Sequence, residues 1–105
     1  MPPDAKTESL GGALVSRNLL EGRGRLRWAF REAGANPADT GWRFLSAIDD
    51  DDYINDPANL QVVDYSTVIG LEPSLEKLYG LPVGAEFEFD VTPDGALRMV
   101  DSRLG

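Results

Sequence analysis

The chain has 105 residues, of which 42% are hydrophobic, and its formal net charge is -8 at neutral pH. It contains no histidine and no cysteine. This excludes Ser-His-Asp and Cys-His nucleophilic sites, thiolate redox centres, and zinc sites built from imidazole and thiolate ligands. The acidic balance also argues against binding to a phosphate backbone, so no nucleic-acid partner is expected.

Length and composition predict one domain with an ordinary hydrophobic core. The absence of cysteine removes disulfides and is typical of a protein kept in a reducing compartment. The first residues lack the layout of an export signal, and no stretch approaches the roughly 18 to 20 apolar residues of a membrane span. We therefore expect a cytoplasmic protein without membrane association, with residues 1–10 as a disordered tail and residues 11–105 as a single α+β domain.

Two segments in the first half of the chain predict strands. A short apolar run, bounded by glycine and by polar residues, predicts a strand over residues 12–16. After a turn at residues 36–41, alternation predicts a second strand over residues 42–48, with Trp42 and Phe44 on the same face. Because both of its faces carry apolar groups, we expect this second strand to lie in the centre of a sheet.

Residues 25–31 alternate charged and apolar side chains. This alternation favours a strand with Leu26, Trp28 and Phe30 on one face. The spacing of Leu26, Ala29, Phe30 and Ala33 also fits one side of a helix, so a helix is the alternative.

The second half of the chain predicts short strands and short helices. Residues 60–64 read as a strand, and Ser66 is a candidate cap for a brief helical turn. Pro73 begins a short helix in which Leu75 and Leu78 share one side.

A β-hairpin is predicted at the C-terminal end. Residues 86–91 alternate strictly, residues 92–95 form a turn, and residues 96–100 return. Its candidates for the buried face are Phe87, Phe89, Val91, Leu97 and Met99. Taken together, the elements predict an α+β fold, with a mostly antiparallel sheet of about five or six short strands and one or two short helices.

Charge is distributed unevenly along the chain. Residues 17–31 hold five arginines against Glu21 alone, a net charge of +4, whereas residues 44–97 hold twelve acids against Lys77 alone, a net charge of -11. The sequence therefore predicts a strongly acidic flank and a smaller basic one. The arginines could contact a partner, or they could form ordinary cross-strand ion pairs, joining Arg25, Arg27 and Arg31 to Glu86, Glu88 and Asp90.

An acidic, turn-rich segment follows the aromatic strand. Residues 49–59 combine four consecutive aspartates with a tyrosine and an Asp-Pro turn. Dense negative charge beside large apolar rings attracts a basic partner or, as an alternative, a hard cation. The predicted partner-binding residues are Trp42, Asp49, Asp50, Asp51, Asp52, Tyr53 and Asp56. Trp42 and Phe44, at strand spacing, are also typical of a core.

Metal binding and catalysis find little support in the residue spacing. Counted from Asp50 as an EF-hand loop, the sixth position is Asn55 and the twelfth is Gln61, where such a loop needs glycine and glutamate. We predict no metal ligands, no cofactor and no catalytic residues, because no motif supplies a pocket for the paired carboxylates that glycosidases use. A small-molecule or cation-binding module that uses the same segment, or a stand-alone domain without a ligand, is the alternative function.

Several of these motifs, in this order, resemble the bacterial immunity protein 33 family, formerly a domain of unknown function. The matching motifs are the strand at residues 12–16, Gly41-Trp42-Arg43-Phe44, Asp50-Asp51-Asp52-Tyr53, Asp56-Pro57-Ala58-Asn59, Glu72-Pro73-Ser74-Leu75, Leu78 and residues 82–88. The chain departs from the family pattern at residues 46–48, where a glycine is usual, and at Glu72, where an aspartate is usual.

The resemblance implies a non-enzymatic protein that binds and neutralises a cognate protein toxin. Members of the family are thought to be encoded near polymorphic toxin genes. An acidic inhibitor suits a basic target, because opposite charge speeds their encounter. On this interpretation the acidic segment covers a cationic face of the toxin.

Overall fold

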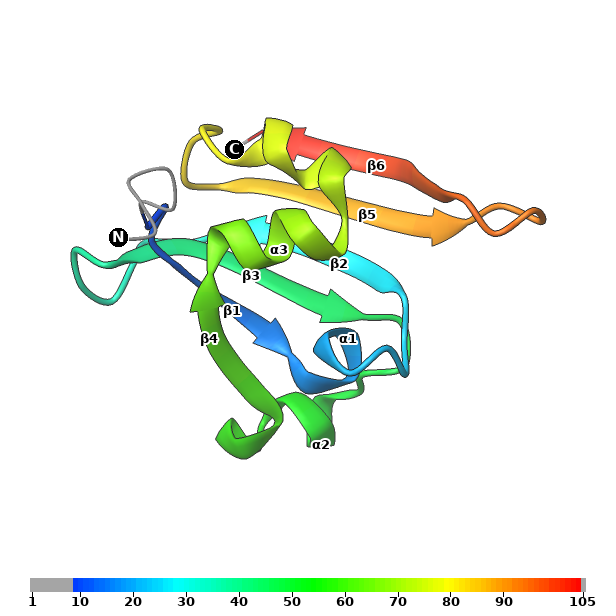
Figure 1. Cartoon of the computed structure of the whole chain (residues 1–105), viewed down its shortest axis with the longest axis horizontal. Coiled ribbons are helices and arrows are strands. Elements are labelled where there is room, and N and C mark those ends of the chain that lie inside the picture. The colour runs from blue at the N-terminus through cyan, green and yellow to red at the C-terminus, as the bar shows by residue number, and fades with distance from the viewer. Residues whose placement is uncertain (1–8, 105) are drawn as a thin grey trace, which may run out of the picture.

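Six strands form a single sheet in the computed structural model, which describes residues 9–104 (Figure 1). The elements in chain order are β1 (Gly12–Ser16), α1 (Arg17–Leu20), β2 (Leu26–Arg31), β3 (Asp39–Ser46), α2 (Asp51–Ile54), the 3-10 helix η2 (Pro57–Asn59), β4 (Leu60–Asp64), α3 (Tyr65–Leu71), the 3-10 helix η3 (Pro73–Leu78), β5 (Ala85–Val91) and β6 (Leu97–Leu104). The strand order across the sheet is β4-β1-β3-β2-β5-β6.

The sheet is mixed, so the prediction of a mostly antiparallel sheet was wrong. Strands β1 and β3 run parallel at the centre, whereas the other neighbouring pairs are antiparallel. The parallel pair arises because β2 crosses to the far side of β3 instead of pairing with β1, and β3 then lies between them. Local alternation identifies strands, but it carries no information about which distant strand each one joins.

Most of the predicted elements are confirmed. β1 and β4 occupy the predicted residues, β2 is a strand rather than a helix, and β3 is central in the sheet. The C-terminal hairpin is also present as β5 and β6. Strand β3 ends at Ser46, so Ile48 lies beyond it with 56% of its surface exposed. Two residues predicted for the buried face of the hairpin, Val91 and Met99, are instead exposed near the turn that joins its strands.

A bulge in β2 reverses the alternation predicted for that strand. Leu26 lies opposite Ser46 and Trp28 lies opposite Leu45, so two steps along β2 match one step along β3. Leu26 is therefore buried on one face, whereas Trp28 lies on the other with 44% of its surface exposed. The prediction that Leu26, Trp28 and Phe30 share a face was wrong, because the extra residue of a bulge shifts every later position by one.

Helices α3 and η3 cover one face of the sheet, as Figure 1 shows. Asp64 caps α3 by accepting a hydrogen bond from the Ser66 amide at 3.0 Å, so the cap lies two residues before the predicted one. Pro73 begins the short helix η3, as predicted, and this helix has the 3-10 form. The core beneath these helices consists of Ala13, Val15, Leu26, Ala29, Trp42, Phe44, Tyr65, Val68, Leu75, Leu78, Ala85, Phe87 and Phe89.

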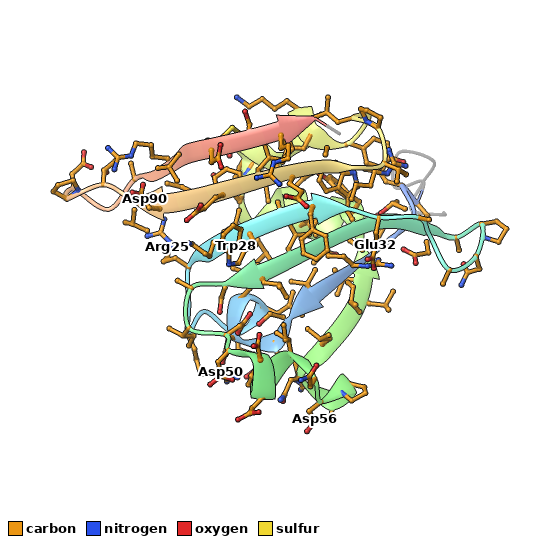
Figure 2. All side chains as sticks on the ribbon, turned by 180° about the vertical axis from the view of Figure 1, so that it is seen from behind. Arg25, Trp28, Glu32, Asp50, Asp56 and Asp90 are labelled. Carbon is orange, nitrogen blue, oxygen red and sulfur yellow. The ribbon has the colours of Figure 1, made fainter. Side chains whose placement is uncertain are left out.

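The opposite face of the sheet carries its own side chains toward the viewer in Figure 2, and we call it the open face. Helix α2 lies at one end of this face. Most of the predicted tail at residues 1–10 lies outside the described residues. Its last two, Ser9 and Leu10, donate hydrogen bonds to the carboxylate of Asp64. None of the helices within residues 9–104 is long and apolar enough to span a membrane.

Candidate partner-binding surface

The acidic segment folds into one turn of α-helix followed by one 3-10 turn. Asp50 caps α2 by accepting a hydrogen bond from the Tyr53 amide at 2.8 Å. Asp56 caps η2 in the same way, through the Ala58 amide at 3.0 Å. The side-chain amide of Asn59 donates to the Tyr53 carbonyl at 2.9 Å and joins the two turns. Because aspartates are favourable at helix N-termini, the residues that give this segment its charge also give it a defined shape.

Asp49 anchors the segment to the sheet. Its carboxylate accepts hydrogen bonds from Ser16 Oγ at 2.9 Å, Asn18 Nδ2 at 2.8 Å and the Ser46 amide at 2.7 Å. Burial alone would raise the pKa of Asp49, but the hydrogen bonds from Ser46, Asn18 and Ser16 outweigh burial, and the pKa is lowered. Since its oxygens are already bonded within the chain, Asp49 holds the segment in position rather than extending toward solvent.

Four aspartates of the segment, Asp50, Asp51, Asp52 and Asp56, are exposed. None of them takes part in the ion pairs found among residues 9–104. Figure 2 shows Asp50 and Asp56 at the same end of the molecule. The segment therefore presents concentrated negative charge on a fixed support.

Tyr53 is half-buried at the base of the segment. Its hydroxyl lies by Arg23, where the pKa of the guanidinium is raised first by Glu21 and next by Tyr53. The tyrosine is thus directed toward the loop that follows α1, with only part of its ring accessible.

Trp42 has no exposed surface, which corrects the prediction that it contacts a partner. Its indole N–H donates to the Tyr79 carbonyl at 3.2 Å, and its ring stacks on Phe44 with 5.9 Å between centroids. Phe87 stacks on the same ring, and Tyr65 packs against it edge-on. The reason is geometric: position 42 lies on the helix-covered face of a central strand, on the side away from the open face.

The basic part of the chain does not form a free cationic patch. Arg27 pairs with Glu88 at 2.8 Å, which confirms one of the predicted cross-strand ion pairs. Arg25 and Arg31 donate instead to backbone carbonyls. Other arginines pair with acids in Arg17–Glu21, Arg23–Glu21, Arg43–Glu32, Arg43–Asp39, Arg98–Asp90 and Arg103–Glu86. Each of these arginines is therefore held by a contact within the chain.

Sequence reasoning missed an apolar hollow on the open face. Trp28, Phe30 and Leu45 line a depression of about 310 Å³. A second depression of about 170 Å³ shares the walls formed by Phe30 and Leu45 and extends to Ile54 in α2. The apolar surface therefore continues up to the acidic segment. Only the bulge in β2 brings Trp28 to this face, and nothing in the sequence marks that bulge.

Within residues 9–104, no three carboxylates lie close enough together to hold a metal ion. In the acidic segment, the carboxylates of Asp50 and Asp56 cap helices and that of Asp49 is bonded to the sheet. Those of Asp51 and Asp52 are exposed and separate from them. The arrangement offers a rigid, charged surface next to an apolar one.

Comparison with known families identifies the chain. Residues 13–101 match the family described as the immunity protein Imm33 domain. Because the match spans most of the chain, the protein belongs to the Imm33 immunity protein family, and the resemblance seen in its motifs is confirmed. No curated protein and no solved structure is significantly similar to it. The matched residues include both the acidic segment and the open face of the sheet.

Proposed function

We propose that this protein is a non-enzymatic immunity protein that binds and neutralises a cognate, basic protein toxin through its acidic segment. One observation carries the proposal: Asp50, Asp51, Asp52 and Asp56 are exposed and lie outside the ion pairs of the described residues. Membership in the Imm33 family supports the immunity role. The encounter belongs in the cytoplasm, because the chain lacks cysteine, as is usual for proteins kept in a reducing compartment.

The physical basis is electrostatic complementarity on a prepared surface. An inhibitor needs no catalytic residue, since occupying the face that the toxin uses is enough to block it. A toxin that attacks nucleic acid is basic because it must approach phosphates, and the same positive charge draws it to an acidic surface. The caps at Asp50 and Asp56 and the anchor at Asp49 fix the segment before binding, so little ordering entropy is lost on association.

Calorimetric titration of the protein with the purified product of an adjacent toxin-like gene tests the proposal. The test variant is Asp51→Asn with Asp52→Asn, because these side chains are exposed and cap nothing. The matched control is Glu72→Gln with Glu76→Gln, which removes the same charge from the helix-covered side of the sheet.

We expect the aspartate variant to bind roughly tenfold more weakly, because each lost surface charge contributes up to about 1 kcal/mol. The control should bind within about twofold of the wild type, and the wild-type affinity should fall as salt is added. Equal affinities for both variants, together with insensitivity to salt, would contradict the proposed role of the acidic segment.

A further inference from the structure

We infer that the open face of the sheet, centred on Trp28, receives an apolar side chain of the same basic partner while the acidic segment binds cationic groups beside it. The inference rests on the proposed function, because it names what that partner presents. The proposed function involves only the acidic segment, whereas this inference adds the apolar surface around Trp28.

The first support is the way the fold turns Trp28 outward. The bulge in β2 places Trp28 opposite Leu45, on the face away from the core, and leaves 44% of the residue exposed. Bulges of this kind re-aim a side chain and are frequent beside functional sites. Exposed tryptophans at the centre of a contact are also among the residues that contribute most to binding.

The second support is that the orientation of the ring is fixed before binding. The Arg27 guanidinium lies over the Trp28 ring, 5.5 Å from its centroid, and pairs with Glu88 at 2.8 Å. The buried Arg27 Nε has no hydrogen-bond partner among the described residues. The guanidinium thus covers part of the ring and favours one orientation of Trp28 on the open face.

The third support is the shape of the surface around Trp28. The depression of about 310 Å³ lined by Trp28, Phe30 and Leu45 has a volume at the lower end of the range for binding pockets. An aromatic or branched aliphatic side chain fits within this volume. Because the neighbouring depression reaches Ile54 in α2, one partner surface can occupy the hollow and meet the acidic segment together.

Charge decides which occupant fits. The arginines of the open face are held in ion pairs with its own acids, as in Arg27–Glu88 and Arg43–Glu32. Asp101, opposite Glu88 on β6, takes no part in the ion pairs of residues 9–104. A second copy of this chain, also with a charge of -8, would be repelled. The complementary occupant is a protein surface on which a projecting apolar residue is flanked by lysine or arginine.

The chain contains two tryptophans, one exposed and one fully buried, which makes the test direct. The protein is labelled with 5-fluorotryptophan, and its two fluorine resonances are assigned with the conservative variant Trp28→Phe. The unlabelled product of the adjacent toxin-like gene is then added. We expect the Trp28 resonance to shift and the Trp42 resonance to stay in place, because Trp42 is enclosed by the core.

Binding by variants completes the experiment. Trp28→Ala should weaken binding at least about tenfold, as expected when a central aromatic contact is removed. Leu71→Ala is the matched control, because it truncates an exposed apolar residue on the helix-covered side, and it should bind like the wild type. Because the resonance measurement uses the unaltered protein, it remains decisive even if Trp28→Ala folds poorly.

The outcomes separate this inference from the proposed function. A Trp28 resonance that stays in place, while Asp51→Asn with Asp52→Asn weakens binding, would overturn the inference and leave the proposed function intact. If the gene product does not bind at all, both fail. A Trp28 resonance that shifts with protein concentration alone would show that a second copy occupies the face, and this too would overturn the inference.

Discussion

Each face of this sheet carries one tryptophan, and the two tryptophans lie in opposite environments. On the helix-covered face, Trp42 is fully buried, its N–H is bonded to the Tyr79 carbonyl, and Phe44 stacks on its ring. On the open face, Trp28 has 44% of its surface exposed and lines a hollow, and a neighbouring hollow that shares Phe30 and Leu45 reaches the acidic segment. One tryptophan stabilises the fold, and the other is available to a partner.

The difference teaches that proximity in sequence to a charged segment is a poor guide to a binding surface. Trp42 precedes the aspartates by a few residues, yet it is buried in the core on the helix-covered face of the sheet. Trp28 is farther away in sequence, but Phe30 and Leu45 connect it across the open face to Ile54 in α2.

The largest expected effect comes from truncating the buried ring. Trp42→Ala should lower the free energy of unfolding by about 3 to 5 kcal/mol, because it opens a cavity and removes the donor to the Tyr79 carbonyl. Trp28→Ala should change the same quantity by less than about 1 kcal/mol. Urea unfolding of both variants measures the contrast, and equal losses would erase the distinction between the two faces.

A second prediction concerns Gly41, a buried glycine within β3. Gly41 has a φ of +90°, and a Cβ there would lie 1.9 Å from the Glu32 carbonyl oxygen. Gly41→Ala should therefore cost at least about 2 kcal/mol. Gly70→Ala is the control, because a Cβ in α3 meets open space, and it should stabilise the fold by about 0.5 to 1 kcal/mol. Thermal unfolding that ranks the two variants in reverse order would contradict this account of Gly41.

The anchor at Asp49 should show itself in the response to acid. Because its folded pKa lies below the ordinary value of 3.8, its contribution to stability is present above about pH 4 and is lost as the pH falls through the folded pKa. Asp49→Asn should cost roughly 1 to 2 kcal/mol at neutral pH and flatten the loss of stability below about pH 4. Asp51→Asn, at an exposed position, is the control and should leave neutral stability unchanged.

Unfolding curves collected from neutral pH down to about pH 2 measure this effect. A variant at Asp49 with the same acid response as the wild type would show that the carboxylate does not anchor the segment. The aspartates at positions 39 and 64 keep some acid sensitivity in every variant, because their pKa values are also lowered.

The smallest expected effects on stability come from changes to the exposed aspartates and from added calcium. Asp51→Asn with Asp52→Asn should change the free energy of unfolding by no more than about 0.5 kcal/mol, because neither side chain is paired in the described residues.

Calcium should leave the melting temperature unchanged, since a ligand stabilises only the state it binds. A melting temperature that rises with calcium would favour the cation-binding alternative instead.

Sequence reasoning succeeded where a pattern is local. Strict alternation in residues 86–91 identified β5, and a bounded apolar run identified β1. It failed where the outcome depends on distant residues. The parallel pairing of β1 with β3 and the bulge before Trp28 leave no trace in local spacing, and they decide the mixed sheet and the aromatic centre of the open face.

The sequence located the charged segment of the candidate site, but it did not separate the structural roles of the residues in that segment. Composition locates a run of like charges, and the acidic segment does lie at the surface. Only packing separates Asp49, bonded to Asn18 and Ser46, from its exposed neighbours. The same is true of Trp42, whose residue type fits both a core and a contact.

The rate of association with the adjacent toxin-like gene product, measured by stopped flow at increasing ionic strength, tests the central claim most directly. If exposed aspartates on a fixed support attract a basic toxin, the rate should fall steeply with salt in the wild type and less steeply in Asp51→Asn with Asp52→Asn. A rate that is independent of salt, and the same in both proteins, would contradict the claim.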